Sequence, residues 1–223
     1  MTKRIDSLLT YLTLRPLFKA MMKIFFVLEV EGQEHVKKYP GAILAGNHTG
    51  FLDGPIILAG SETPILFLVA QGVLSWPVIG FLVRWIGILT VRHSQTRRSL
   101  KRAIQYLKAK QTLCIFPEGE LTRDGELGKF HGGVTFLHTQ SQAPIIPFAI
   151  HGGYEAWRWG QWVPKFGKIY LKFGEPMIAY DQDKEAILNK LYQEIQSMKQ
   201  ILGMKQILEK PIYIETLEAQ EAK

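Results

Sequence analysis

Apolar runs of strand length, separated by longer segments with helical spacing, restrict the fold of this 223-residue chain more than any other feature. The runs predicted to form strands are residues 41–46, 64–70, 112–116, 143–150 and 167–174, the last of them half-exposed. The segments 94–110 and 183–208 carry apolar residues at helical intervals. No internal repeat or Ser/Gly linker is present. The alternation predicts a single α/β domain with a mixed or mainly parallel sheet flanked by helices, and with functional loops at the strand ends.

The first of these runs leads into a turn that carries a histidine and an aspartate. His48 and Asp53 are followed by an apolar run with Pro55 near its start, the pattern of a helix with Asp53 as its N-cap. On a continuous helix the two side chains would lie about 140° apart, so a turn must intervene, and Gly50 permits one. An aspartate that holds one ring nitrogen leaves the other free to accept a proton. The pair is a candidate general base, or else a surface pair of polar residues.

A second stretch favours the catalytic interpretation. Residues 114–125 run from a strand end through the sequence Phe-Pro-Glu-Gly into a loop rich in turn residues. Together with residues 47–53 they resemble the third and first sequence blocks of the glycerolipid acyltransferases, the family that acylates glycerol phosphate and lysophospholipids. Residues 87–92 resemble the second block and residues 143–147 the fourth. All four blocks occur in the order of the family and cover most of the chain.

The resemblance implies roles for individual residues. His48 and Asp53 match the catalytic pair of the H-x4-D motif, with His48 taking the proton of the acceptor hydroxyl while Asp53 holds the ring. Arg92 matches the arginine that contacts the acceptor phosphate, and Arg123 and Lys129 would assist it. No serine or cysteine stands in a nucleophile elbow, so direct transfer from the thioester is expected in place of an acyl-enzyme.

The third block departs from the commonest family pattern. Many members have threonine and arginine directly after its glycine, whereas here residues 120–122 separate Gly119 from Arg123. The longer form resembles a branch of the family in which the arginine follows later. Glu118 and Gly119 belong to the substrate-binding set, and Glu118 is expected to order the loop or contact the polyol of the acceptor. Backbone N–H groups near Gly50 or Gly119 are the candidate donors to the oxyanion.

The resemblance also implies the substrates. The donor would be an acyl-CoA or acyl-carrier-protein thioester, and the acceptor a lysophospholipid, foremost lysophosphatidic acid, or glycerol phosphate. No cofactor and no metal is expected. Two alternatives stay open: a CoA-independent transacylase or hydrolase that uses the same pair, and a non-catalytic peripheral lipid-binding protein.

Composition narrows the class of partner. The formal net charge of +7 indicates an anionic partner, which could be nucleic acid, a phosphate-bearing substrate or an anionic membrane surface. Nucleic acid is not expected, because no zinc-ligand spacing, recognition helix or single-strand-binding motif is found. The single cysteine, Cys114, excludes an intrachain disulfide and fits a reducing compartment. Its apolar surroundings predict a buried thiol.

The N-terminal segment has the pattern of a helix that lies on a membrane. Arg15, Lys19 and Lys23 interrupt the apolar residues 5–30, so neither a membrane span nor a secretory signal is expected. The three cations recur at helical spacing and face one side, which predicts peripheral membrane association at the cytoplasmic face. The alternative is a helix that packs on the core. The predicted divisions are a membrane-associating amphipathic helical segment 1–28, an acyltransferase domain 29–210 and a tail 211–223.

Two further apolar segments invite a lipid interpretation. Residues 73–87 are expected to form two short helices that line an acyl pocket, dip into lipid or belong to the core. Trp157, Trp159 and Trp162 share a loop with Arg158 and Lys165. Aromatic side chains beside cations suit a membrane interface, although tryptophans that cover the edge of a core give the same pattern.

Overall fold

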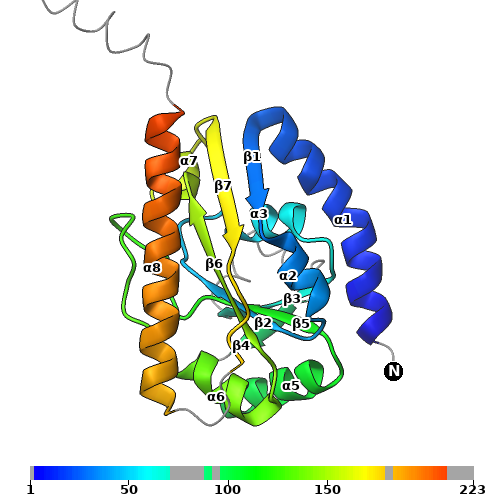
Figure 1. The fold of residues 1–223 in the computed structure, drawn as a ribbon. Helices are drawn as coiled ribbons and strands as arrows, with labels where there is room; N and C mark the ends of the chain where they lie inside the picture. The colour runs from blue at the N-terminus through cyan, green and yellow to red at the C-terminus, as the bar shows by residue number, and fades with distance from the viewer. Residues whose placement is uncertain (1–2, 71–87, 92–95, 179–182, 210–223) are drawn as a thin grey trace, which may run out of the picture.

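The computed structural model describes residues 3–70, 88–91, 96–178 and 183–209. In these ranges the chain forms one seven-stranded sheet with helices on both faces (Figure 1). The strands are β1 (Phe26–Glu31), β2 (Ile43–Gly46), β3 (Ile65–Ala70), β4 (Ile88–Val91), β5 (Thr112–Ile115), β6 (Ile145–His151) and β7 (Gly167–Phe173). The helices are α1 (Lys3–Phe25), α2 (Gln33–Lys38), α3 (Asp53–Gly60), α5 (Thr96–Lys108), α6 (Gly133–Ser141), α7 (Gly153–Trp157) and α8 (Lys184–Leu208).

The sheet is mixed and mainly parallel, as the sequence predicts. Its strand order is β1-β7-β6-β2-β5-β3-β4. The five strands from β6 to β4 run parallel to one another, β7 is antiparallel to β6, and β1 is parallel to β7. In the centre, Leu44 of β2 pairs with Cys114 of β5 on one side and with Ile146 of β6 on the other.

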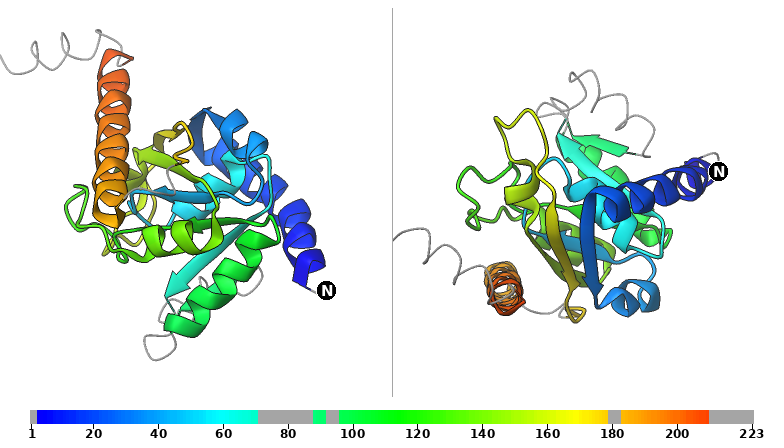
Figure 2. Two further views of the ribbon diagram at one scale, coloured as in Figure 1. Left: turned by 60° about the horizontal axis from the view of Figure 1, so that its bottom comes forward. Right: turned by 90° about the horizontal axis from the view of Figure 1, so that it is seen from above.

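The core lies in two layers, one on each face of the sheet. Ile43 points into a cluster with residues of α5, α6 and α8, whereas its neighbour Leu44 points into a cluster with α1 and α3. Successive strand residues face opposite sides, so a central strand covered on both faces must be apolar throughout. The long helices α1 and α8 accordingly lie on opposite sides of the sheet (Figure 2).

The N-terminal helix ends earlier than expected. α1 stops at Phe25, and β1 begins at Phe26, where Phe26 to Leu28 pair with residues 167–169 of β7. The predicted boundary after residue 28 therefore falls inside the sheet, because the alternating residues of β1 suit a strand. Phe18 and Met22 are buried in the core, as a packed helix requires, whereas other apolar side chains of α1 are exposed. In the described part of the chain, no helix is both long and apolar enough to span a bilayer.

β7 is more buried than its alternating sequence predicts. It lies between β1 and β6, and Ile169, Tyr170 and Leu171 are buried in succession. The other predicted strands and both predicted helices are present, and Asp183 caps α8 by accepting a hydrogen bond from the N–H of Glu185. The predicted helices in residues 73–87 and the tail 211–223 lie outside the described residues.

A network of ion pairs joins β1, β7 and α8. Lys172 of β7 lies 3.0 Å from Glu31 of β1, and Lys205 of α8 lies 2.7 Å from the same carboxylate. Lys168 pairs with both Glu29 of β1 and Glu209. The lysines lower the pKa of Glu31 below its usual range through these hydrogen bonds. Segments from the two ends of the described chain are thereby connected.

Candidate active site

The candidate site lies where the strand order diverges. β2 and β5 are neighbouring parallel strands, so the loops that follow Gly46 and Ile115 leave the same edge of the sheet. After β2 the chain continues through α3 to β3, which lies beyond β5 on one side of β2. β6 lies on the other side of β2. Such a switch point opens a crevice at the carboxyl ends of the strands. It brings together His48 and Glu118, which are 70 residues apart in the sequence.

His48 and Asp53 form a hydrogen-bonded pair at this edge of the sheet. Nδ1 of His48 lies 2.7 Å from Oδ2 of Asp53, whose side chain is only 1% exposed. The aspartate also accepts hydrogen bonds from the N–H of Thr49 at 2.7 Å, the hydroxyl of Thr49 at 2.5 Å and the N–H of Gly50 at 3.0 Å. A carboxylate only accepts, so the bond places the ring proton on Nδ1. Nε2 is left as the nitrogen that can accept a proton.

Asp53 is not the N-cap of α3, contrary to the sequence prediction. Leu52 occupies that position without a side-chain hydrogen bond, and Asp53 is the first helical residue. Its carboxylate turns back toward the N–H groups of Thr49 and Gly50, which precede the helix. These donors and the ring of His48 together use its acceptor capacity. The turn is therefore built around the carboxylate.

Two glycines make room for this turn. A Cβ atom on Gly153, at the start of α7, would lie 2.4 Å from Oγ1 of Thr49. A Cβ on Gly50 would lie 2.3 Å from the carbonyl oxygen of Trp157. Gly50 does not have a positive φ angle, so close approach of the chain is what requires glycine there. The corner between β6 and α7 thus supports the turn from outside.

Phe116 fixes the plane of the His48 ring. The two rings are stacked, with centroids 3.9 Å apart and planes inclined by 10°. Phe116 in turn packs edge-on against buried Phe148, at 5.9 Å. A role for Phe116 could not be predicted from the sequence, because only the fold reveals that the loop after β5 stacks on the turn after β2.

The loop after β5 also holds the main chain of His48 on both sides. Oε1 of Glu118 accepts a hydrogen bond from the N–H of His48 at 2.8 Å, and the N–H of Thr122 donates to the carbonyl oxygen of His48 at 3.0 Å. Oε2 of Glu118 accepts from the N–H of Gly128 at 2.8 Å. Glu118 therefore orders the loop in this structure, and its contact with an acceptor stays a prediction. We call these contacts the His48 clamp.

Burial raises the pKa of Glu118, although the two backbone N–H groups that it accepts from act in the opposite direction. A raised pKa means that the folded state favours the protonated acid, so any stabilisation from this group is lost as pH rises through that pKa. The clamp, in contrast, needs the carboxylate to accept from both N–H groups. The contacts of Glu118 with the N–H groups of His48 and Gly128 are therefore opposed by the burial of its carboxyl group.

The backbone N–H groups of Gly50 and Gly119 themselves already have acceptors. The N–H of Gly50 donates to Asp53, and that of Gly119 donates to the carbonyl oxygen of Phe116 at 3.1 Å. That other N–H groups near Gly50 or Gly119 meet the developing oxyanion stays a prediction. Gly119 is needed for its backbone conformation, since its φ angle is +77°.

Of the residues predicted to bind phosphate, two lie exposed in the loop after β5 and the third lies outside the described residues. Arg123 is exposed and follows Thr122 of the clamp, and Lys129 is also exposed in the same loop. The hydroxyl of Tyr154 donates to the carbonyl oxygen of Arg123 at 2.6 Å, and the guanidinium of Arg158 lies over the ring of Tyr154. Arg92 lies outside the described residues, although it follows β4 in the sequence.

Asn47 is a further residue of the site that the sequence left without a role. Its side chain donates to the carbonyl oxygen of Ile150 and accepts from the N–H of Ile150, both at 2.8 Å. This pairing continues the β2–β6 ladder beyond the end of β2 and fixes where the turn begins. A polar residue directly after an apolar strand was the available signal, but its partner lies 103 residues away.

Within the described residues, neither Cys114 nor a metal site adds to the chemistry of the candidate active site. Cys114 is buried in β5, and burial raises the pKa of its thiol well above the usual value, so it is a structural residue. Among the described residues, no group of three or more His, Cys, Asp or Glu side chains could hold a metal ion.

We expect Glu118→Gln to lower kcat by about 10- to 100-fold, the scale set by losing a hydrogen bond to a charged group. The amide NH₂ would face the N–H of His48 or of Gly128, and the histidine would lose its position. Since Glu118 acts through His48, the KM for the acceptor should change much less than kcat. Steady-state kinetics with each substrate varied separately measure the two effects.

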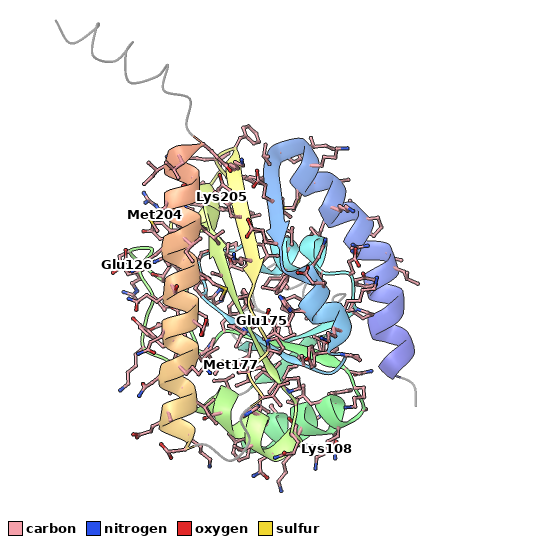
Figure 3. The ribbon with its side chains drawn as sticks, viewed as in Figure 1. Lys108, Glu126, Glu175, Met177, Met204 and Lys205 are labelled. Atoms are coloured by element: carbon pink, nitrogen blue, oxygen red, sulfur yellow. The ribbon has the colours of Figure 1, made fainter. Side chains whose placement is uncertain are left out.

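Glu126→Gln is the matched control, because Glu126 is an exposed glutamate of the same loop (Figure 3) and its carboxylate pairs with Lys199. It should leave kcat unchanged. An effect of Glu118→Gln on the KM of the acceptor alone would instead make Glu118 a substrate contact.

Comparison with known proteins identifies the family. Residues 27–151, more than half of the chain, match the model of the family described as Acyltransferase. The chain belongs to the acyltransferase family. The matched range contains β1 to β6 and therefore the His48–Asp53 pair and the clamp.

Curated members of the acyltransferase family are similar over most of this chain. A 1-acyl-sn-glycerol-3-phosphate acyltransferase of Limnanthes douglasii is 29% identical over 158 residues, which are 69% of this chain and 56% of the relative. One of Pseudomonas aeruginosa is 27% identical over 71% of this chain and 62% of the relative. A lyso-ornithine lipid O-acyltransferase of the same organism is 31% identical over 47% of this chain and 40% of the relative. The chain thus spans little more than half the length of the first of these relatives.

The fold of the acyltransferase family is also recovered among solved structures. The 1-acyl-sn-glycerophosphate acyltransferase PlsC of Thermotoga maritima superposes with a TM-score of 0.70 over 84% of this chain and 79% of that chain. The sequence identity is 24%, so this likeness concerns the fold.

Proposed function

We propose that this chain is an O-acyltransferase that moves a fatty acyl group from a thioester to the hydroxyl of lysophosphatidic acid, in phospholipid biosynthesis. The observation that carries the proposal is the His48–Asp53 pair, whose 2.7 Å bond leaves Nε2 available at the carboxyl edge of the sheet. The names of curated relatives from Limnanthes and Pseudomonas support the acceptor. The donor would be an acyl-CoA or acyl-carrier-protein thioester, and no cofactor is required.

The mechanism is a direct transfer. Nε2 of His48 takes the proton of the acceptor hydroxyl as its oxygen attacks the thioester carbonyl carbon, and Asp53 stabilises the imidazolium that forms. The tetrahedral intermediate collapses with cleavage of the C–S bond. The departing thiolate then receives the proton from His48, which restores the base. Neither Ser nor Cys has to form a covalent intermediate.

Cations would align the acceptor. Arg92, Arg123 and Lys129 are proposed to bind its phosphate, and Gly119 with Glu118 to border the acceptor site. The net charge of +7 favours such a substrate and also an anionic membrane surface. Peripheral association with the cytoplasmic face of a membrane is part of the proposal, since both the acceptor and the product are lipids.

One assay tests the proposed reaction. Purified protein is given labelled acyl-CoA or acyl-carrier protein with lysophosphatidic acid, glycerol phosphate or lyso-ornithine lipid. Labelled phosphatidic acid is the expected product. Lyso-ornithine lipid is included because the chain is similar to the second Pseudomonas enzyme. A preference for this lipid would change the proposed acceptor. Labelled free fatty acid without an acceptor would indicate a hydrolase, and no product with any donor would contradict an acyltransferase.

Arg123→Ala should raise the KM of a phosphate-bearing acceptor by roughly 10- to 100-fold with little effect on the KM of the donor. A charge-assisted contact with phosphate contributes about 1.5–3 kcal/mol. Arg123→Lys should restore only part of it, since lysine keeps the charge but not the planar fork. Kinetics with donor and acceptor varied separately give the result.

Arg98→Ala on α5 is the control, because Arg98 is also exposed but stands on a helix outside the loop of the clamp. A defect in the KM of the donor alone would assign Arg123 to the donor phosphates.

A further inference from the structure

Large apolar side chains are exposed together at one place in the molecule. They come from the junction of α1 with β1 and from the loop between α7 and β7. Their exposed fractions are 74% for Ile24, 46% for Phe25, 60% for Val27, 95% for Trp162, 71% for Val163 and 72% for Phe166. We call these six residues the aromatic surface. Single exposed apolar residues are ordinary, but a contiguous group of this size marks an interaction site.

The two segments of the aromatic surface are in contact. The rings of Phe25 and Phe166 are stacked, with centroids 5.8 Å apart and planes inclined by 13°. Phe166 also lies 6.5 Å from the ring of buried Phe26. The first residues of β1 and β7 are paired, which brings the two segments to the same end of the sheet (Figure 1). Phe166 therefore joins the two segments and connects them to the core.

Cations border the aromatic surface. Lys23, Arg158 and Lys165 are exposed, and none of them forms an ion pair with another described residue. Tryptophan and phenylalanine side chains beside lysine and arginine are the composition that favours the headgroup region of a bilayer. Anionic lipids would pair with the cations while the rings enter the boundary between headgroups and acyl chains.

The same loop touches the catalytic turn. The ring of Trp159 lies 5.9 Å from that of Phe51, which is two residues before Asp53. The N–H of Phe51 donates to the carbonyl oxygen of Trp157 at 3.3 Å. A bilayer bound at the aromatic surface would lie against the element that supports His48. An acceptor lipid could then reach the base without leaving the membrane.

We infer that the aromatic surface is a membrane-docking surface for bilayers that contain anionic lipid, and that it presents the catalytic turn to a lipid acceptor. The first half of this inference stands on exposure and charge, and the second half rests on the proposed function. A further exposed apolar group, at the end of α8, differs in composition. It contains Met204, Ile207 and Leu208 but no aromatic ring, and Lys205 beside it is engaged with Glu29 and Glu31 (Figure 3).

Vesicle flotation tests the docking surface. The double variant Trp162→Ser and Phe166→Ser removes two exposed rings and should retain the fold. With vesicles of phosphatidylcholine and phosphatidylglycerol, we expect its partition coefficient to fall by at least about 10-fold, since burial of one large apolar side chain contributes on the order of a 10-fold change. Lys165→Glu should weaken binding to these vesicles but not to pure phosphatidylcholine. The double variant Ile207→Ser and Leu208→Ser is the control and should bind as the unaltered protein does.

The outcomes separate the two halves of the inference. Unchanged flotation of the aromatic variant overturns the docking surface, as does a control variant that loses binding equally. A dimer that dissociates in the aromatic variant while flotation is unchanged would assign the surface to a second copy.

If docking presents the catalytic turn to lipid, the aromatic variant should lose more activity on a vesicle-borne acceptor than on a soluble short-chain acceptor. The ratio of the two rates then falls. Normal flotation of a protein without transferase activity would contradict the proposed function but not the docking surface.

Discussion

His48→Ala is expected to abolish acyl transfer while leaving the fold intact. Nε2 of His48 is the nitrogen of the pair that can take the proton of the acceptor, and general-base catalysis contributes at least ~10²-fold to the rate. Loss of the stacking contact with Phe116 should cost little stability, because the side chain of His48 is partly exposed. Initial rates with labelled acyl-CoA and circular dichroism of the same preparation measure the two effects.

His35→Ala is the control for this variant. His35 is a partly buried histidine of α2 that faces Glu34 and Glu175, away from the crevice. It should keep the rate of the unaltered protein. If a folded His48→Ala protein kept most of its activity, His48 would have no part in the mechanism. A circular-dichroism spectrum of an unfolded protein would show that the residue is structural.

Asp53→Asn should lower the rate by roughly 10²- to 10⁴-fold and also destabilise the protein. The carboxylate accepts four hydrogen bonds, from His48, from Gly50 and twice from Thr49. An amide can accept with one oxygen only, so its NH₂ group would face donors in a side chain that is 1% exposed. The loss should reach about 1–3 kcal/mol of unfolding free energy. Initial rates and thermal unfolding give both numbers.

Asp183→Asn provides the comparison, since Asp183 is an exposed N-cap and asparagine caps helices equally well. That variant should change neither rate nor stability. If Asp53→Asn were inactive but as stable as the unaltered protein, the aspartate would serve the base alone and would not hold the turn together.

Much of the fold could be predicted from the sequence because its signals are local. The apolar runs at β2, β3, β6 and β7 and the helical spacing at α5 and α8 each depend on a few neighbouring residues. The alternation of strands and helices indicates a mainly parallel sheet, but strand order depends on contacts between distant segments, and no local pattern reports it. β1 was missed because the apolar residues of α1 continue into it without a break. The same continuity misplaced the boundary at residue 28.

The residues of the site likewise fall into those that local sequence predicts and those that only the fold reveals. His48 and Asp53 lie five residues apart, so their contact could be expected once a turn was assumed. Phe116 after β5 and Gly153 after β6 contact that turn, and Asn47 after β2 pairs with Ile150 of β6, so their importance follows only from the sheet order. Glu118 was noticed, but its two partners could not be known. The amides of Gly50 and Gly119 illustrate the same limit, because a sequence does not tell whether an amide already has an acceptor.

The ion pairs between β1, β7 and α8 set limits on how far the protein can be trimmed. A deletion that reached residue 28 would remove part of β1, and with it buried Phe18 and Met22. A deletion from the other end that reached Lys205 would leave Glu31 with one lysine partner and uncover the outer face of β7. Shortened proteins would lose activity because the sheet is disrupted at its β1 side, whatever their affinity for membranes. The proposed membrane attachment is therefore better tested by exchanging surface side chains than by removing either terminus.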